Sequence, residues 1–123
     1  MKQALLVFVG GGFGSVVRYL LGKWLNNIEN AIPYGTMLSN VLGGLLIGII
    51  LGYFVKVSDL NNDLTLLLAV GFCGGFTTFS AFAYENHLYL KNGDYLSFLI
   101  YTLGSLVLGF SAVFVGLYFS KFL

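Results

Sequence analysis

The residues best suited to chemistry in this chain form the run Gly71-Phe72-Cys73-Gly74-Gly75-Phe76-Thr77-Thr78-Phe79-Ser80-Ala81-Phe82. Adjacent glycines followed by two β-branched threonines form helix poorly, so the run predicts a break in a helix. A break frees backbone carbonyl oxygens, which a hard cation accepts as ligands. Thr78 or Ser80 could cap a restarting helix, whose first N–H groups favour a nearby anion. The alternative is an intact helix whose hydroxyl groups bond to the preceding turn.

Two aromatic residues follow the predicted break at a spacing that places them on one helix face. These are Phe79 and Phe82, three positions apart. The edge of an aromatic ring is electropositive, so it can face a poorly hydrated anion without carrying a full positive charge. Packing against helices or lipid is the ordinary role of such rings, and it remains the alternative.

Polar side chains also interrupt two other apolar segments. Thr36 lies one turn before Asn40, and Tyr101 lies one turn before Ser105. The Asn40 amide offers both a donor and an acceptor, and burying it costs free energy unless it is paired. Lining a pore and bonding between helices both fit Asn40. For Tyr101 and Ser105, bonds between helices are the ordinary expectation.

Four ionisable or reactive residues complete the set of candidates. Arg18 lies well inside the first apolar segment, where an ionisable residue is costly and usually functional. Glu85 follows the predicted break, and His87 is interpreted as a residue of the membrane interface. The single cysteine, Cys73, can form no intrachain disulfide and is expected to pack as a small apolar residue. No catalytic triad or paired histidine is present, so the sequence does not predict an enzyme.

Four apolar segments must position these residues, at about 4–25, 34–55, 64–90 and 95–120. Each reaches the ~20 residues that cross ~30 Å of hydrocarbon. Only 9% of the 123 residues are charged, against roughly 25% in a soluble domain. We therefore predict one all-α membrane domain over residues 1–123, with four spans and a break near 74–79 in the third. Short polar connections are expected at 26–33, 56–63 and 91–94.

Small residues recur at four-residue spacing in every span, which is typical of helices that pack closely in lipid. The pattern predicts a compact helical bundle, although it does not separate contacts within one chain from contacts between chains. The residues concerned are Gly10, Gly14, Gly44, Gly48, Gly52, Gly71, Gly75, Ser105 and Gly109.

The positive charges divide evenly between the two ends of this arrangement. Lys2, Lys56 and Lys121 fall at the end that holds both termini, and Arg18, Lys23 and Lys91 fall at the other. Orientation is normally set by an excess of Lys and Arg in cytoplasmic loops, and here there is none. The chain could insert both ways up, or other signals could fix one orientation. The net charge of +1 indicates no nucleic acid partner.

The order and spacing of these motifs resemble the Fluc/CrcB-type fluoride ion channel family along nearly the whole chain. The motif from Gly71 to Phe82, with Glu85 after it, is the specific match. The segment from Tyr34 to Gly44, which contains Asn40, and the segment from Gly14 to Arg18 support it. The resemblance implies an antiparallel, dual-topology homodimer in the cytoplasmic (inner) membrane, with pores that export fluoride passively and so lower its toxicity.

The resemblance also implies roles for individual residues. Phe79 and Phe82 would present ring edges to fluoride, and Asn40 would donate to it. Gly74 and Thr77 would turn backbone carbonyls toward a structural sodium ion between the subunits. The remaining pore residues implied are Arg18, at a vestibule, Thr36, Thr78, Ser80, Glu85, Tyr101 and Ser105. In the family, the residues matching Thr36, Tyr101 and Ser105 form a polar track. Some family members extend it with a further serine where this chain has Gly109, so the outer part of the polar track differs here.

A small dual-topology, proton-coupled exporter of cations or drugs is the alternative function. That class uses an acidic residue in its first span, and residues 4–25 contain neither Asp nor Glu. A scaffold subunit without transport is a third possibility, but it would need neither Asn40 nor a helix break.

Overall fold

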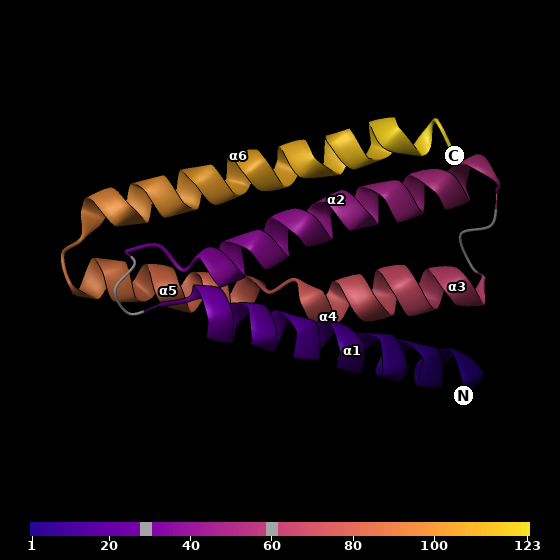
Figure 1. Cartoon of the computed structure of the whole chain (residues 1–123), viewed down its shortest axis with the longest axis horizontal. Coiled ribbons are helices and arrows are strands. Elements are labelled where there is room, and N and C mark those ends of the chain that lie inside the picture. The colour runs from indigo at the N-terminus through magenta and orange to yellow at the C-terminus, as the bar shows by residue number, and fades with distance from the viewer. Residues whose placement is uncertain (28–30, 59–61) are drawn as a thin grey trace.

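The computed structural model describes residues 1–27, 31–58 and 62–123. The predicted connections at 26–33 and 56–63 therefore lie partly outside the described residues. Within the described part the chain is helical, without a strand, and four helical segments are long and apolar enough to cross a membrane: Lys2–Leu25, Tyr34–Lys56, Asp63–Lys91 and Tyr95–Ser120. Figure 1 shows both termini at the same end of the bundle, as an even number of spans requires.

Three of the spans are continuous helices, and the third is assembled from pieces. The continuous helices are α1 (Lys2–Leu25), α2 (Tyr34–Lys56) and α6 (Tyr95–Ser120). The third span consists of α3 (Asp63–Thr65), η1 (Leu66–Cys73), α4 (Gly74–Phe76) and α5 (Phe79–Lys91).

The predicted break lies in the third span, and two threonines form it. Thr77 (φ −88°, ψ 155°) and Thr78 (φ −150°, ψ 118°) are both extended. The Thr78 hydroxyl accepts a hydrogen bond from the Ala81 N–H at 3.2 Å, so Thr78 rather than Ser80 caps α5. Gly74 and Gly75 stay helical, which makes the break shorter than the predicted 74–79.

The segment before the break is a π-helix, which the sequence did not predict. In η1 each backbone bond spans one residue more than in an α-helix, and the N–H of Gly74 reaches the carbonyl of Ala69. This π-helix and the following α4 pack directly on α1 through glycines. A Cβ added to Gly75 would lie 3.0 Å from the Cα of Gly11, and one added to Gly10 would lie 2.9 Å from the Phe72 nitrogen. π-Helical turns within α-helices are frequently found at functional sites.

The second helix pair is formed by α2 and α6, which lie side by side in Figure 1. Glycines again allow the approach, because a Cβ at Gly48 would lie 3.1 Å from the Cα of Gly116. The bundle thus consists of two close pairs, α1 with the third span and α2 with α6.

The interior of the subunit is small, and most large apolar side chains lie on its outside. Cys73 is 1% exposed and packs in the core, as expected for an apolar cysteine, and Tyr101 is fully buried. By contrast Phe8 and Phe114 are 76% and 70% exposed. Apolar surface on this scale fits a protein surrounded by lipid.

Replacing Gly10 with alanine is expected to lower the melting temperature of the protein in detergent. The added Cβ would press on the backbone of η1, and overpacking of this kind costs about 1–3 kcal/mol. Gly12 is the matched control, since a Cβ there meets nothing within 4 Å. Gly12→Ala should leave the melting temperature unchanged or raise it, because alanine is the better helix former. Equal melting temperatures for the two variants would show that α1 does not pack on η1 in this way.

Candidate functional site

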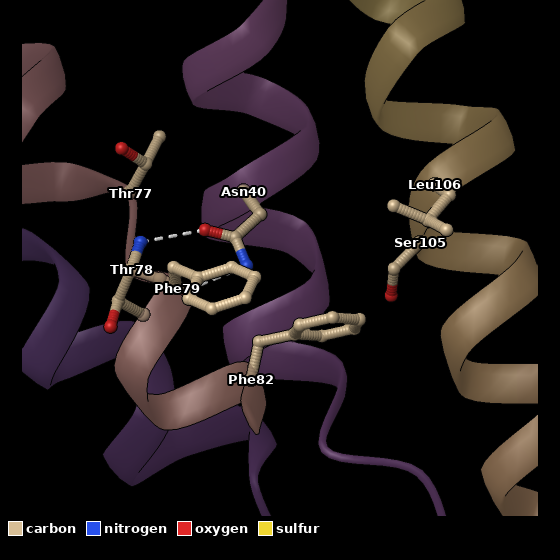
Figure 2. Close-up of a pocket in the computed structure, with 7 residues that line it drawn as sticks. All are labelled: Asn40, Thr77, Thr78, Phe79, Phe82, Ser105 and Leu106. Carbon is tan, nitrogen blue, oxygen red and sulfur yellow. Dashed lines mark hydrogen bonds between the residues drawn. The ribbon is translucent and has the colours of Figure 1, made fainter. Parts of the chain in front are cut away.

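The two backbone groups of Thr78 freed by the break are both bound by one side chain, Asn40. The Thr78 N–H donates to Asn40 Oδ1 at 2.7 Å, and Asn40 Nδ2 donates to the Thr78 carbonyl at 3.2 Å (Figure 2). Of the two interpretations of Asn40, bonding between segments is therefore observed. An amide carries two N–H hydrogens, and the bond to Thr78 uses one of them. The second hydrogen leaves Asn40 able to donate to another acceptor.

Arg18 supports the other side of the break. Its Nε donates to the Gly75 carbonyl at 3.0 Å, and the side chain is half-buried. Gly75 lies two residues before the break, so a charged donor from α1 fixes the end of α4. The guanidinium has further N–H donors beyond the one used here. Attraction of an anion by Arg18 remains a prediction.

Three of the predicted polar residues form one hydrogen-bond network. The Thr36 hydroxyl donates to Glu85 Oε2 at 2.7 Å, and the Tyr101 hydroxyl donates to Glu85 Oε1 at 2.6 Å. The residues come from α2, α5 and α6, so the network joins three helices. Thr36 and Tyr101 are buried, at 5% and 0% exposure. Both oxygens of the Glu85 carboxylate are thereby held by hydroxyl groups.

A cavity of about 270 Å³ lies beside the break and gathers most of the other candidates. The side chains that line it come from α2, the break, α5 and α6 (Figure 2): Asn40, Thr77, Thr78, Phe79, Phe82, Ser105 and Leu106. No residue in this lining is charged. Among the described residues, Ser105 Oγ is a buried side-chain oxygen without a hydrogen-bond partner. Such an atom is costly unless water or an ion satisfies it.

The aromatic residues connect this cavity to the hydroxyl network. The ring centroids of Phe79 and Phe82 are 6.1 Å apart, and those of Phe82 and Tyr101 are 5.2 Å apart. Phe82 therefore lies between the cavity and Tyr101. Phe79 is 79% exposed, so the cavity is open on that side of the subunit.

The remaining candidates lie at the edges of this arrangement. The Ser80 and Thr78 hydroxyls are 3.2 Å apart and share a hydrogen bond. A second cavity of about 340 Å³ adjoins the first, and Asn40, Thr77 and Ser105 line both. Gly74 and Gly109 line the second cavity. A Cβ added to Gly109 would meet nothing within 4 Å, so the position at which a serine is absent opens onto free space.

Asn26 also takes part in the hydroxyl network, although no sequence motif marks it. Its Oδ1 accepts from the N–H groups of Gly35 and Thr36, and its Nδ2 donates to the Thr36 hydroxyl at 3.0 Å. The residue lies nine or ten positions before its partners, far outside the local spacing of a helix cap. These contacts of Asn26 are visible only in the structure, where the end of α1 approaches the start of α2.

Comparisons with known proteins agree on one family. Residues 5–117 match the family described as "CrcB-like protein, Camphor Resistance (CrcB)". A protein from Gloeothece citriformis named "Fluoride-specific ion channel FluC" is 48% identical over 122 residues, which cover 98% of each chain. Proteins of the same name from Phocaeicola vulgatus and Leptospira interrogans are 46% and 42% identical. Those alignments cover 98% of this chain and 100% and 95% of the relatives, respectively.

Proposed function

The chain belongs to the CrcB-like protein family, and we propose that it forms a fluoride-selective channel through which fluoride leaves the cell passively. The observation that carries the proposal is the cavity at the helix break. It combines the unpartnered hydroxyl of Ser105, the amide of Asn40 and the rings of Phe79 and Phe82. The family consists of channels, so no enzymatic reaction is involved.

The physical task of such a channel is to replace the water around a small anion. Fluoride accepts strong hydrogen bonds, and the cavity offers donors from an amide and a hydroxyl. Aromatic ring edges add positive electrostatic potential without the tight binding of a full charge. Conduction needs binding that is favourable enough for entry and weak enough for exit. An uncharged lining with a few donors meets both requirements.

The ion's path would continue from the cavity past Phe82 to the hydroxyl groups of Tyr101 and Thr36. These two hydroxyls presently donate to Glu85, so an arriving fluoride would compete with that carboxylate for their hydrogens. Thr78 and Ser80 would supply hydroxyls beside the cavity. Arg18, with donors beyond the one that holds Gly75, would raise the local concentration of anions at a vestibule.

A homodimer of oppositely oriented subunits is the assembly we propose. Phe79 and the cavity beside it are open to the outside of a single subunit, and a polar cavity cannot face hydrocarbon without cost. A second subunit would close it. The positive charges are balanced, three at each end, which allows insertion of both orientations. The cytoplasmic, or inner, membrane of the cell is the proposed location.

A sodium ion at the subunit interface fits the backbone around the break. The N–H of Thr78 donates to Asn40, so the Gly74 carbonyl lacks the helical partner that an unbroken helix would supply. The extended conformation of Thr77 turns its own carbonyl away from the helix path. Gly74 is exposed, and a Cβ there would meet nothing within 4 Å. Carbonyl oxygens of Gly74 and Thr77 from two subunits would form a hard-oxygen site.

Removing sodium is expected to weaken the dimer and lower the fluoride flux. Without a cation, carbonyl oxygens gathered at the interface would repel one another. Dimer content can be measured by analytical ultracentrifugation in detergent, with sodium replaced by N-methylglucamine at constant ionic strength, and flux can be measured in matched liposomes. If dimer content and flux both stay unchanged, the assignment of Gly74 and Thr77 is wrong.

The proposed function is tested with purified protein in liposomes loaded with either fluoride or chloride. Efflux is followed with ion-selective electrodes while valinomycin and potassium balance the charge. The expected result is rapid loss of fluoride, retention of chloride, and the same fluoride rate with or without a proton gradient. Fluoride that stays trapped in protein-containing liposomes would disprove the channel. Efflux that requires a proton gradient would favour a coupled exporter.

A further inference from the structure

Asn26 is held by the backbone in one defined orientation. Its Oδ1 accepts from the N–H of Gly35 at 2.7 Å and from the N–H of Thr36 at 3.2 Å. Backbone N–H groups can only donate, so the oxygen of the amide must face them. The nitrogen of the same amide must then face the Thr36 hydroxyl, which lies 3.0 Å away.

This orientation decides where the hydroxyl hydrogen of Thr36 points. A hydroxyl group has one hydrogen to donate and lone pairs to accept. Because Asn26 Nδ2 donates to Thr36 Oγ1, the hydrogen of that hydroxyl is free for its other neighbour, Glu85 Oε2 at 2.7 Å. Thr36 therefore presents a hydrogen, and not a lone pair, to the position that Glu85 occupies.

The close approach behind these contacts depends on a glycine. A Cβ added to Gly35 would lie 2.8 Å from Asn26 Oδ1 and 2.6 Å from the Leu21 carbonyl. The chain also bends immediately after α1, where the N–H of Asn26 still bonds to the Gly22 carbonyl at 2.9 Å. The end of α1 and the start of α2 are thus joined through one side chain. Asn26 and Glu85 also line a common cleft of about 450 Å³.

We propose that Asn26 is a positioning residue for anion passage, which keeps the Thr36 hydroxyl hydrogen directed into the polar track. An anion that displaces the Glu85 carboxylate from Thr36 meets a hydrogen-bond donor there. Without the amide N–H, the hydroxyl is free to turn its lone pairs toward the anion, which repels it. The inference rests on the proposed fluoride channel and adds a residue that does not touch the ion itself.

Asn26→Asp separates this role from that of a helix cap. Aspartate caps a helix as well as asparagine does, so the two backbone N–H groups keep their acceptor. The amide donor is lost, and the new carboxylate competes with Glu85 for the single hydrogen of Thr36. A cap alone predicts normal flux in Asn26→Asp and a loss of stability in Asn26→Ala. A positioning role predicts reduced flux in Asn26→Asp at an unchanged melting temperature.

The experiment measures fluoride efflux from liposomes and melting in detergent for both variants. We expect efflux in Asn26→Asp to fall about tenfold, the factor that corresponds to one hydrogen bond. Gln3→Glu, at an exposed residue of α1, makes the same change in net charge and leaves the balance of Lys and Arg intact, so it should stay within about twofold of the wild type. Wild-type efflux in Asn26→Asp, or an equal fall in Gln3→Glu, would overturn the inference.

A double variant tests whether the effect passes through Thr36. In a Thr36→Val background the hydroxyl is absent, so adding Asn26→Asp should lower efflux no further. If Thr36→Val alone conducts normally, or if the two effects multiply, Asn26 does not act through this hydroxyl and the inference fails. Failure of the channel itself has a different result, because then the wild-type protein releases no fluoride either.

Discussion

Replacing Asn40 with aspartate is expected to lower fluoride efflux by at least about 100-fold. Two charges 4 Å apart interact by about 4 kcal/mol at an effective dielectric constant of 20, and each 1.4 kcal/mol is about tenfold. A carboxylate in the cavity would repel the anion by an energy of this size. The new carboxylate would also lose the hydrogen bond in which Asn40 Nδ2 now donates to the Thr78 carbonyl at 3.2 Å.

The change should affect folding much less than conduction. A carboxylate oxygen can still accept the Thr78 N–H, which is the shorter of the two bonds at 2.7 Å. Asn62→Asp is the matched control, because Asn62 caps α3 by accepting from the Thr65 N–H and aspartate can do the same. Fluoride efflux and melting temperature should be measured for both variants. Near-normal efflux in Asn40→Asp would place the ion's path away from this cavity.

Phe79→Ala is expected to reduce fluoride efflux by about tenfold, since an aromatic contact of favourable geometry contributes up to about 1.5 kcal/mol. The stability of the single subunit should change little. Phe79 is 79% exposed, so removing its ring leaves no cavity within the subunit. Its contribution would therefore appear in conduction and, in the proposed dimer, at the subunit interface.

Phe8→Ala provides the comparison, because Phe8 is 76% exposed on α1 and does not line the cavity at the break. The expected result is normal efflux in Phe8→Ala and reduced efflux in Phe79→Ala. Dimer content of both variants should be measured in detergent, so that a loss of assembly is distinguished from a loss of conduction. Equal efflux from the two variants would remove Phe79 from the pore.

The spans and the break could be predicted because both depend on local properties of the sequence. Runs of apolar residues long enough to cross hydrocarbon define the four spans, and the pattern of two glycines and two threonines marks the break. The cap by Thr78 follows from the same local rules. The π-helical form of η1 could not be predicted, because the apolar run Leu66–Cys73 carries no local signal that separates a π-helix from an α-helix.

The candidate residues could be named from the sequence one by one, but the contacts between them could not be predicted. Thr36, Glu85 and Tyr101 were identified separately, whereas their common network requires α2, α5 and α6 to meet. Asn40 left two roles open, and only the position of the break showed its bonds to Thr78. Asn26 was missed because its partners are distant in sequence and its contacts depend on the bend after α1.

The glycine pattern illustrates the same limit. The four-residue spacing predicted close helix contacts, and such contacts occur between α1 and η1 and between α2 and α6. The spacing did not predict which helices pair with one another. Gly109 brings its carbonyl oxygen within 3.1 Å of a Cβ added to Gly44, yet a Cβ added to Gly109 itself would meet nothing within 4 Å, and the residue lines a cavity.

The reversal potential of the current through the protein in a planar bilayer tests the central claim most directly. Fluoride is set at a tenfold gradient, with chloride and pH equal on both sides. A fluoride-selective channel predicts a reversal potential of about 59 mV, the value for one charge per ion. The potential should stay there when a pH gradient is added. A reversal potential near zero, or one that follows the pH gradient, would contradict passive and selective conduction of fluoride.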